Sequence, residues 1–186
     1  MDDKQIIELY WARSESAIAE TDRKYGKLCH RIAYNILVNR EDSEECVNDT
    51  YLKTWGIIPP KRPVKLGAFL GKITRNLALN RYEKLHAEKR GGGEVPIALD
   101  ELAECIPDPN SVERVVDNRT LADKFNVFIS ELPKDARKIF MRRYWELSSV
   151  NEIASVYGIS ESKVKMTLFR TRGKLRAFLE KEGIAL

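Results

Sequence analysis

The apolar positions of this chain recur at intervals of three and four residues, which is the spacing of one face of an α-helix. The clearest case lies within residues 16–37, where the recurring side chains are Tyr25, Leu28, Cys29, Ile32, Ala33, Ile36 and Leu37. Similar patterns predict helices over 4–11, 42–55 and 66–89, and then over 112–131, 134–145, 150–157 and 160–181. Because no alternating strand pattern of any length is present, we predict an all-α fold.

Proline and glycine divide these helices into two groups. Pro59, Pro60 and Pro63 predict a loop between the third and fourth helices, and Gly91-Gly92-Gly93 ends the fourth. The triple glycine lacks the Gly-Lys-Ser/Thr ending of a phosphate-binding loop, so we interpret it as the start of a linker. The chain is therefore predicted to hold a helical domain over 1–90, a flexible Gly- and Pro-bearing linker over 91–111, with a helical turn at 99–102, and a second helical domain over 112–186.

The charged residues follow the same division. The chain carries only +4 overall, but residues 61–90 hold nine basic and two acidic residues, which gives +7. Residues 91–117 hold one basic and seven acidic residues, and 159–186 hold seven basic and three acidic ones. Two basic blocks separated by an acidic one suit two modules that contact nucleic acid and a connector that does not.

The most specific local pattern lies in the last third of the chain and predicts a helix-turn-helix. Residues 152–157 supply a short helix, Gly158 tolerates the left-handed backbone of a turn, and Ser160 is a good N-cap for the second helix. One face of that second helix is apolar and carries Val164, Leu168, Thr171 and Leu175. The opposite face carries Ser162, Met166, Phe169, Arg170 and Gly173. Basic and short polar side chains of this kind can contact phosphates and base edges, although a solvated surface helix is the alternative.

The helix predicted over 42–55 has a mixed outer surface. Val47, Tyr51 and Trp55 lie on one side, whereas the other side is expected to carry Asp42, Glu45, Cys46, Asp49 and Lys53 outward, with Leu52 at its edge. An acidic surface that contains apolar atoms suits docking on another protein. A solvated acidic face is the alternative interpretation.

Other classes of protein find little support in the residues. The N-terminus lacks a cationic leader with an apolar core, and no apolar run approaches the roughly 20 residues needed to cross a bilayer, so we expect a cytoplasmic protein without membrane insertion. The three cysteines are odd in number and contain no C-x-x-C pair, which predicts reduced thiols and no metal site. Without paired histidines or a nucleophile motif, we expect neither an enzyme nor a cofactor, and no catalytic residue is assigned.

With both halves in view, the chain resembles a bacterial extracytoplasmic-function (ECF) sigma factor. Residues Arg40 to Trp55 are similar to the family's polymerase-binding segment, and Ala68 to Arg81 to the helix that takes part in minus-10 recognition. The minus-35 domain is matched by Leu132-Pro133, Arg142-Arg143-Tyr144, Glu152-Ile153-Ala154, Gly158-Ile159-Ser160 and the run from Val164 to Leu175. Three residues depart from the family pattern: Leu147-Ser148 stands where Gly-Leu is common, and Asn80 stands where Asp is frequent.

The resemblance implies core RNA polymerase and promoter DNA as partners, and control by an anti-sigma factor. The implied polymerase-binding residues are Asp42, Glu45, Asp49, Leu52 and Lys53. In the first domain, where the family's loop holds a flipped-out base, the implied DNA-binding residues are Lys61, Arg62, Lys65, Arg75, Asn76, Asn80, Arg81 and Lys84. In the helix-turn-helix they are Ser162, Lys163, Met166, Thr167, Arg170, Arg172 and Lys174, with Arg170 suited to guanine and Lys163 or Arg172 to phosphate.

Two other functions fit the sequence less well than the resemblance does. A stand-alone helix-turn-helix regulator would explain the second half of the chain only, and such regulators usually need a dimer to span two half-sites. A helical enzyme would need a constellation of catalytic side chains that the sequence does not offer.

Overall fold

The computed structural model describes residues 1–86, 98, 100–102 and 118–184. Throughout these ranges the secondary structure is helical, without a strand, so the all-α prediction is confirmed. The chain divides into two compact units, Met1–Gly91 and Gly92–Leu186. Most of the predicted linker over 91–111 lies outside the described residues, although the positions described at 98 and 100–102 are helical.

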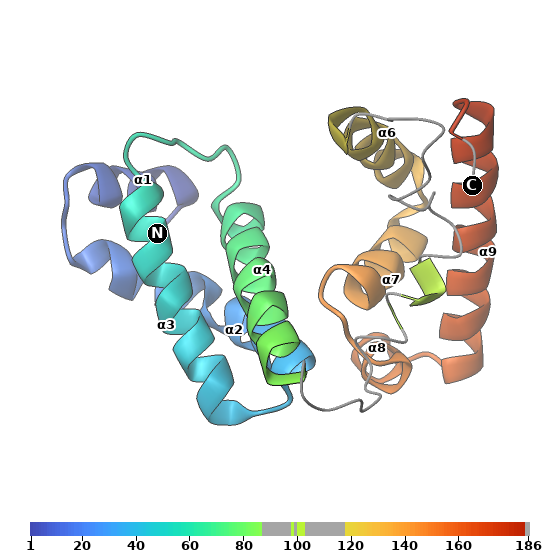
Figure 1. Ribbon diagram of the computed structural model, residues 1–186, viewed down its shortest axis with the longest axis horizontal. Coiled ribbons are helices and arrows are strands. Elements are labelled where there is room, and N and C mark those ends of the chain that lie inside the picture. The colour runs from blue at the N-terminus through green and yellow to red at the C-terminus, as the bar shows by residue number, and fades with distance from the viewer. Residues whose placement is uncertain (87–97, 99, 103–117, 185–186) are drawn as a thin grey trace. The chain divides into compact units, whose positions relative to one another are not determined.

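The first unit is built from four helices, α1 (Asp3–Trp11), α2 (Ser16–Leu37), α3 (Arg40–Ile57) and α4 (Leu66–His86). Helices α2, α3 and α4 lie side by side and pack on one another, and α1 packs on α2 (Figure 1). Ile32 and Ile36 of α2 and Leu66 and Leu70 of α4 are fully buried between them. The predicted helices over 4–11, 16–37, 42–55 and 66–89 are thus all present, and residues 87–89 lie outside the described part.

Small hydroxyl side chains fill much of this core. Thr21, Thr50, Thr54 and Thr74 are completely buried, and each donates its hydroxyl to the carbonyl four residues earlier in its own helix. Because the hydroxyl is satisfied locally, the rest of the side chain can pack as an apolar group.

The prediction that Cys46 faces outward is wrong. Its side chain is buried among these hydroxyl groups, and its thiol lies 3.7 Å from the carbonyl oxygen of Thr74. The buried face of α3 therefore consists largely of serine, threonine and cysteine, flanked by Val47 and Tyr51, and it is wider than the apolar residues alone indicate.

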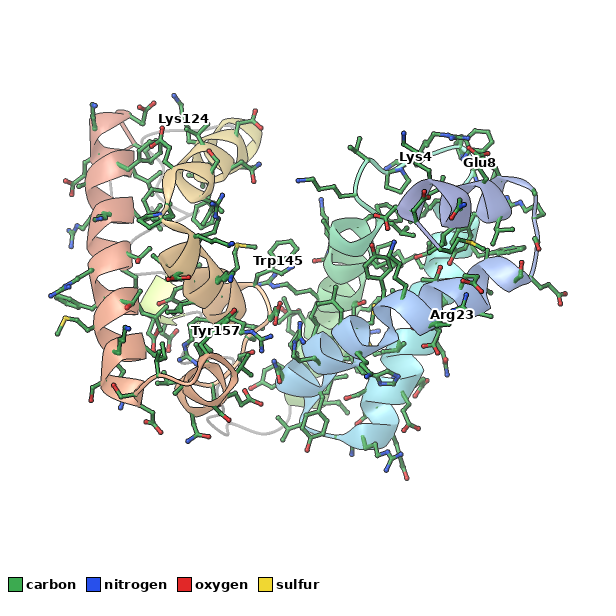
Figure 2. The ribbon with its side chains drawn as sticks, turned by 180° about the vertical axis from the view of Figure 1, so that it is seen from behind. Lys4, Glu8, Arg23, Lys124, Trp145 and Tyr157 are labelled. Atoms are coloured by element: carbon green, nitrogen blue, oxygen red, sulfur yellow. The ribbon has the colours of Figure 1, made fainter. Side chains whose placement is uncertain are left out.

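Helix α1 holds the start of α4 and the loop before it. The Asp3 carboxylate accepts hydrogen bonds from the Tyr25 hydroxyl at 2.5 Å, the Lys24 ammonium at 2.6 Å and the Leu66 backbone N–H at 3.0 Å. Burial opposes the charged form, but these donors together lower the pKa of Asp3 below its usual value. In the loop, Arg62 pairs with Glu8 of α1 at 2.6 Å, and Figure 2 shows Glu8 on that helix.

The second unit contains α6 (Asn118–Glu131), α7 (Lys134–Tyr144), α8 (Val150–Tyr157) and α9 (Glu161–Lys181). Helices α6, α7 and α8 all pack on the long α9 (Figure 1). Phe140 is the centre of an aromatic cluster, with ring centroids 6.1 Å from Phe125, 6.3 Å from Phe128 and 4.6 Å from Tyr144. The predicted second-domain helices are all found, and positions 112–117 of the first of them are outside the described residues.

Candidate nucleic-acid and protein interfaces

The helix-turn-helix forms because each of its helix ends is capped. Ser149 and Glu152 form a reciprocal capping box at the start of α8, with Ser149 Oγ accepting the Glu152 N–H at 3.2 Å and Glu152 accepting the Ser149 N–H at 2.7 Å. Gly158 ends α8 in the left-handed conformation, at φ 62°. Ser160 then caps α9 by accepting the Lys163 N–H at 3.2 Å. These caps fix the angle at which α9 leaves the turn.

The exposed surface of α9 carries most of the predicted DNA-binding residues. Val164, Leu168, Thr171 and Leu175 are buried, which confirms the predicted inner face. Ser162, Lys163, Met166, Arg170 and Lys174 are exposed on the rest of the helix, and Thr167 is half-buried. Lys163 and Thr167 also line a cavity of about 320 Å³ between α7, Tyr157, Ile159 and α9.

Arg172 occupies a different environment from the other predicted DNA-binding residues of α9. It donates to the Tyr144 hydroxyl at 2.8 Å and pairs with the Glu101 carboxylate at 3.3 Å. Glu101 also pairs at 2.9 Å with Arg143, which is only 1% exposed and donates in addition to the Ser148 carbonyl at 3.2 Å. Burial opposes the charge on Glu101, but these donors lower its pKa below the usual value. Arg172 therefore helps to hold α9 on α7 through a carboxylate outside both helices.

A basic groove of about 460 Å³ lies in the first unit between the end of α3, the following loop and α4. It is lined by Lys53, Ile57, Lys61, Arg62, Pro63, Phe69, Lys72, Ile73 and Asn76. Four of these nine described residues are basic and none is acidic, and Phe69 supplies a half-buried aromatic ring. A basic groove with an aromatic side chain is the combination that binds single-stranded nucleic acid, because cations follow the backbone and the ring stacks on a base.

The groove brings together some of the predicted residues and not others. Lys61, Arg62 and Asn76 line it, and Asn80 continues the line of Lys72 and Asn76 along α4 at four-residue spacing. Lys65 and Lys84 are exposed outside its lining. Arg75 is half-buried, and burial lowers its pKa.

Arg81 contacts the surface assigned to protein binding. Its guanidinium pairs with Asp42 at 2.7 Å and with Glu45 at 2.5 Å, both on α3. The hydrogen bond from Arg81 lowers the pKa of Glu45 below its usual value. One predicted DNA-binding residue is thus tied to two predicted polymerase-binding residues.

The outer face of α3 combines acidic and apolar side chains as expected. Glu45 and Asp49 are exposed, Asp42 is half-buried, and the Leu52 side chain is 69% exposed. Lys53 is also exposed, but it lines the basic groove. Leu52 thus adds an exposed apolar side chain to a helix face that also carries Glu45 and Asp49, and this composition is compatible with contact to another protein.

Phe69 and Lys72 are the aromatic and the basic groove residue that were not predicted from the sequence to bind DNA or another partner. Lys72 was part of the basic block in the sequence but had no motif to distinguish it, and Phe69 resembles one more apolar residue of a helix. Their four-residue relation to Ile73 and Asn76 is the signal that places them beside the loop.

Two negative findings apply to the described residues alone. Among them, no helix is both long and apolar enough to cross a bilayer. Likewise, within those ranges no three His, Cys, Asp or Glu side chains are grouped so that they could hold a metal ion.

A helical unit with a basic groove, joined in one chain to a helix-turn-helix unit, is a combination typical of DNA-binding proteins. Residues 22–88 match Sigma-70 region 2, and residues 123–175 match Sigma-70, region 4. The chain belongs to the ECF sigma factors of the sigma-70 family.

Several curated proteins are similar over most of this chain. It is 27% identical over 166 residues to the ECF RNA polymerase sigma factor SigE of Mycolicibacterium smegmatis, a match that covers 88% of this chain and 62% of that protein. It is 26% identical over 168 residues to the Probable RNA polymerase sigma factor RfaY of Xanthomonas campestris, covering 86% of this chain and 41% of that protein. With the ECF RNA polymerase sigma factor SigM of Bacillus subtilis it shares 22% identity, over 86% of this chain and 93% of the relative. The chain thus spans less than two thirds of the first two relatives.

Proposed function

We propose that this protein binds core RNA polymerase, directs it to specific promoters and helps to open the duplex. The observation that carries the proposal is the presence in one chain of a helix-turn-helix and of a separate basic groove with an aromatic side chain. The helix-turn-helix presents α9 in the way that duplex readers do, whereas the basic groove of the first unit suits a single strand with an unstacked base. A stand-alone regulator would use the first surface and leave the groove without a role.

The proposal assigns a role to each surface. Asp49, Leu52 and Glu45 of α3 would contact polymerase, and the groove residues Lys61, Lys72 and Phe69 would hold a separated strand. On α9, Arg170 and its neighbours would read the minus-35 element. The chain would select the promoter, and it would not catalyse RNA synthesis. This role places the protein in the bacterial cytoplasm. A further proposed partner is an anti-sigma protein that covers these surfaces.

The polymerase surface is tested by in vitro transcription with bacterial core polymerase and a pool of promoter fragments from the source genome. Asp49→Lys is expected to abolish promoter-specific transcripts because it reverses a charge at the centre of the α3 face. Glu15→Lys makes the same change of charge at an exposed position of the same unit and should transcribe like the wild type. Tight DNA binding by the wild type without any association with core polymerase would favour the stand-alone regulator.

Two kinds of DNA template distinguish the roles of the two proposed DNA-binding surfaces. Phe69→Ala is expected to lower transcription from duplex promoters and to recover on a template whose minus-10 region is already unpaired, because stacking on the ring would stabilise the open strand. Arg170→Ala should lose promoter selection on both templates, and Arg176→Ala, an exposed arginine later in α9, is its control. Equal effects of Phe69→Ala on both templates would contradict the role given to the groove.

A further inference from the structure

The outermost line of α9 is apolar rather than charged. Ser162, Met166, Phe169 and Gly173 follow one another at spacings of four, three and four residues, which places them on one line along the helix. Met166 is 50% exposed and Phe169 is 66% exposed, opposite the buried Val164 and Leu168. Two large apolar side chains thus stand in solvent at the centre of the surface that is proposed to face DNA.

Gly173 extends this line and is not required by the packing of its own unit. Apart from its chain neighbours and the backbone of its own helix, a Cβ atom built at this position would have no atom of the described residues within 4 Å. Glycine in the middle of a helix is less stable than alanine, so the fold alone would favour a larger residue here. A missing side chain on an open surface is useful where the backbone of a ligand approaches the helix closely.

The charges beside this line show which kind of ligand fits. Lys163, Arg170 and Lys174 are exposed along one flank of the line, and Lys165 on the other flank is 66% exposed and 3.8 Å from Glu161. A ligand for this surface is therefore anionic and carries apolar groups at intervals. Duplex DNA meets both conditions, because the thymine C5-methyl group is the apolar feature of the major groove.

We propose that Met166 and Phe169 read thymine methyl groups in the major groove, and that Gly173 admits the sugar-phosphate backbone close to α9. This inference rests on the proposed function and deepens it, since it names the bases that the minus-35 element must contain. Arg170 adds a hydrogen-bonding contact beside the methyl contacts, so the expected element places thymine next to guanine on the surface that faces α9.

Uracil-substituted promoters test the methyl contacts directly. Uracil keeps every hydrogen-bonding group of thymine and removes the methyl group alone. With a duplex that the wild type selects from a random pool, each thymine of the upstream element is replaced singly by uracil and relative binding is measured. At one or more positions the wild type should bind about fourfold more weakly, the effect of losing one buried methyl group.

Alanine variants of α9 identify the side chain that contacts each uracil-sensitive thymine. Met166→Ala and Phe169→Ala should each become insensitive to uracil at a position where the wild type is sensitive. Val127→Ala removes a comparably exposed apolar side chain from α6 of the same unit and should keep the sensitivity of the wild type. Gly173→Ala should raise the melting temperature and yet weaken binding to the selected duplex, a combination that a purely structural role would not produce.

The outcomes separate this inference from the proposed function. If the full chain selects no duplex, either alone or with core polymerase, both fail. If it selects a duplex but no thymine can be distinguished from uracil, the methyl contacts are wrong and promoter selection stands. If Met166→Ala and Phe169→Ala weaken binding to an acidic regulatory protein and leave uracil sensitivity intact, the apolar line is a protein-binding surface and the inference is overturned.

Discussion

Glu101 shows how much one carboxylate contributes to the second unit. It contacts Arg143, Tyr144 and Arg172, and the Arg143 side chain is almost completely buried. We expect Glu101→Gln to destabilise the unit by on the order of 3 kcal/mol at pH 7, because a buried guanidinium would lose its carboxylate partner. Chemical unfolding in a Trp11→Phe, Trp55→Phe background makes Trp145 the reporter of this unit. Glu180→Gln, which removes an exposed pair with Arg176, should change stability by less than about 0.5 kcal/mol.

The same carboxylate predicts a pH dependence. Because the folded state lowers the pKa of Glu101, its contribution is complete above the ordinary value of 4.5 and is lost as the pH falls through the lower folded pKa. The stability difference between the wild type and Glu101→Gln should therefore shrink at successive pH values below 4.5. A constant difference across that range would mean that charge is not what Glu101 contributes.

Cys46 is predicted to be chemically inert in the folded protein. Burial, reinforced by the nearby Asp49 charge, raises the pKa of its thiol to about 11, so almost no thiolate is present at neutral pH. Iodoacetamide should modify Cys46 only when the first unit unfolds, and peptide mass spectrometry with and without urea measures this. Rapid modification without denaturant would show that the hydroxyl-lined face of α3 opens readily.

At the scale of the helices, the corner between α7 and α8 contains a strained residue. Leu147 has φ 55°, in the left-handed region, and its side chain is 1% exposed. The family pattern that the chain resembles commonly has glycine at this position, and the left-handed backbone explains why glycine suits it. In this chain the burial of a leucine side chain offsets the backbone strain.

Two substitutions at Leu147 separate these effects. Leu147→Ala should destabilise the second unit by roughly 3 kcal/mol, because it removes the buried side chain and keeps the strain. Leu147→Gly removes the same packing but relieves the strain, so it should be less destabilising than alanine by about 1 kcal/mol. Thermal or chemical unfolding of both variants measures the difference, and a glycine variant no more stable than the alanine variant would show that the corner is not strained.

Helices could be predicted from the sequence where their inner faces are apolar, as in α2 and α9. The inner face of α3 was harder to predict because its threonines and Cys46 count as polar in a sequence pattern. The threonine hydroxyl groups donate hydrogen bonds to carbonyls of their own helix, and only the three-dimensional packing shows this. Hence the positions of the helices were predicted well, but Cys46 was placed on the wrong side.

The candidate surfaces were predictable to the extent that they lie along a single helix. The exposed residues of α9 and the acidic face of α3 follow from helical spacing alone. Arg81 and Arg172 illustrate the limit, because their partners are 36 and 71 residues away in the sequence. The basic groove was also not predictable from helical spacing, because its lining comes from two helices and a loop. Lys53 lies on α3 and Lys72 on α4.

For the molecule as a whole, the two matched family regions are shorter than the two compact units. The match to region 2 begins at residue 22 and the match to region 4 at residue 123, whereas the units are Met1–Gly91 and Gly92–Leu186. In each unit an acidic residue ahead of the match completes the packing: Asp3 joins α1 to α2 and α4, and Glu101 joins α7 to α9.

This arrangement decides where the chain can be cut or recombined with a relative. A hybrid sigma factor joined at the edges of the matched regions would exchange each unit without its carboxylate. Arg143 would then lack Glu101, or the start of α4 would lack Asp3. A junction near residue 92 transfers Glu101 together with the helices that it holds. A fragment of residues 92–186 should therefore fold with greater stability than one of residues 118–186, although the shorter fragment contains every helix of the helix-turn-helix.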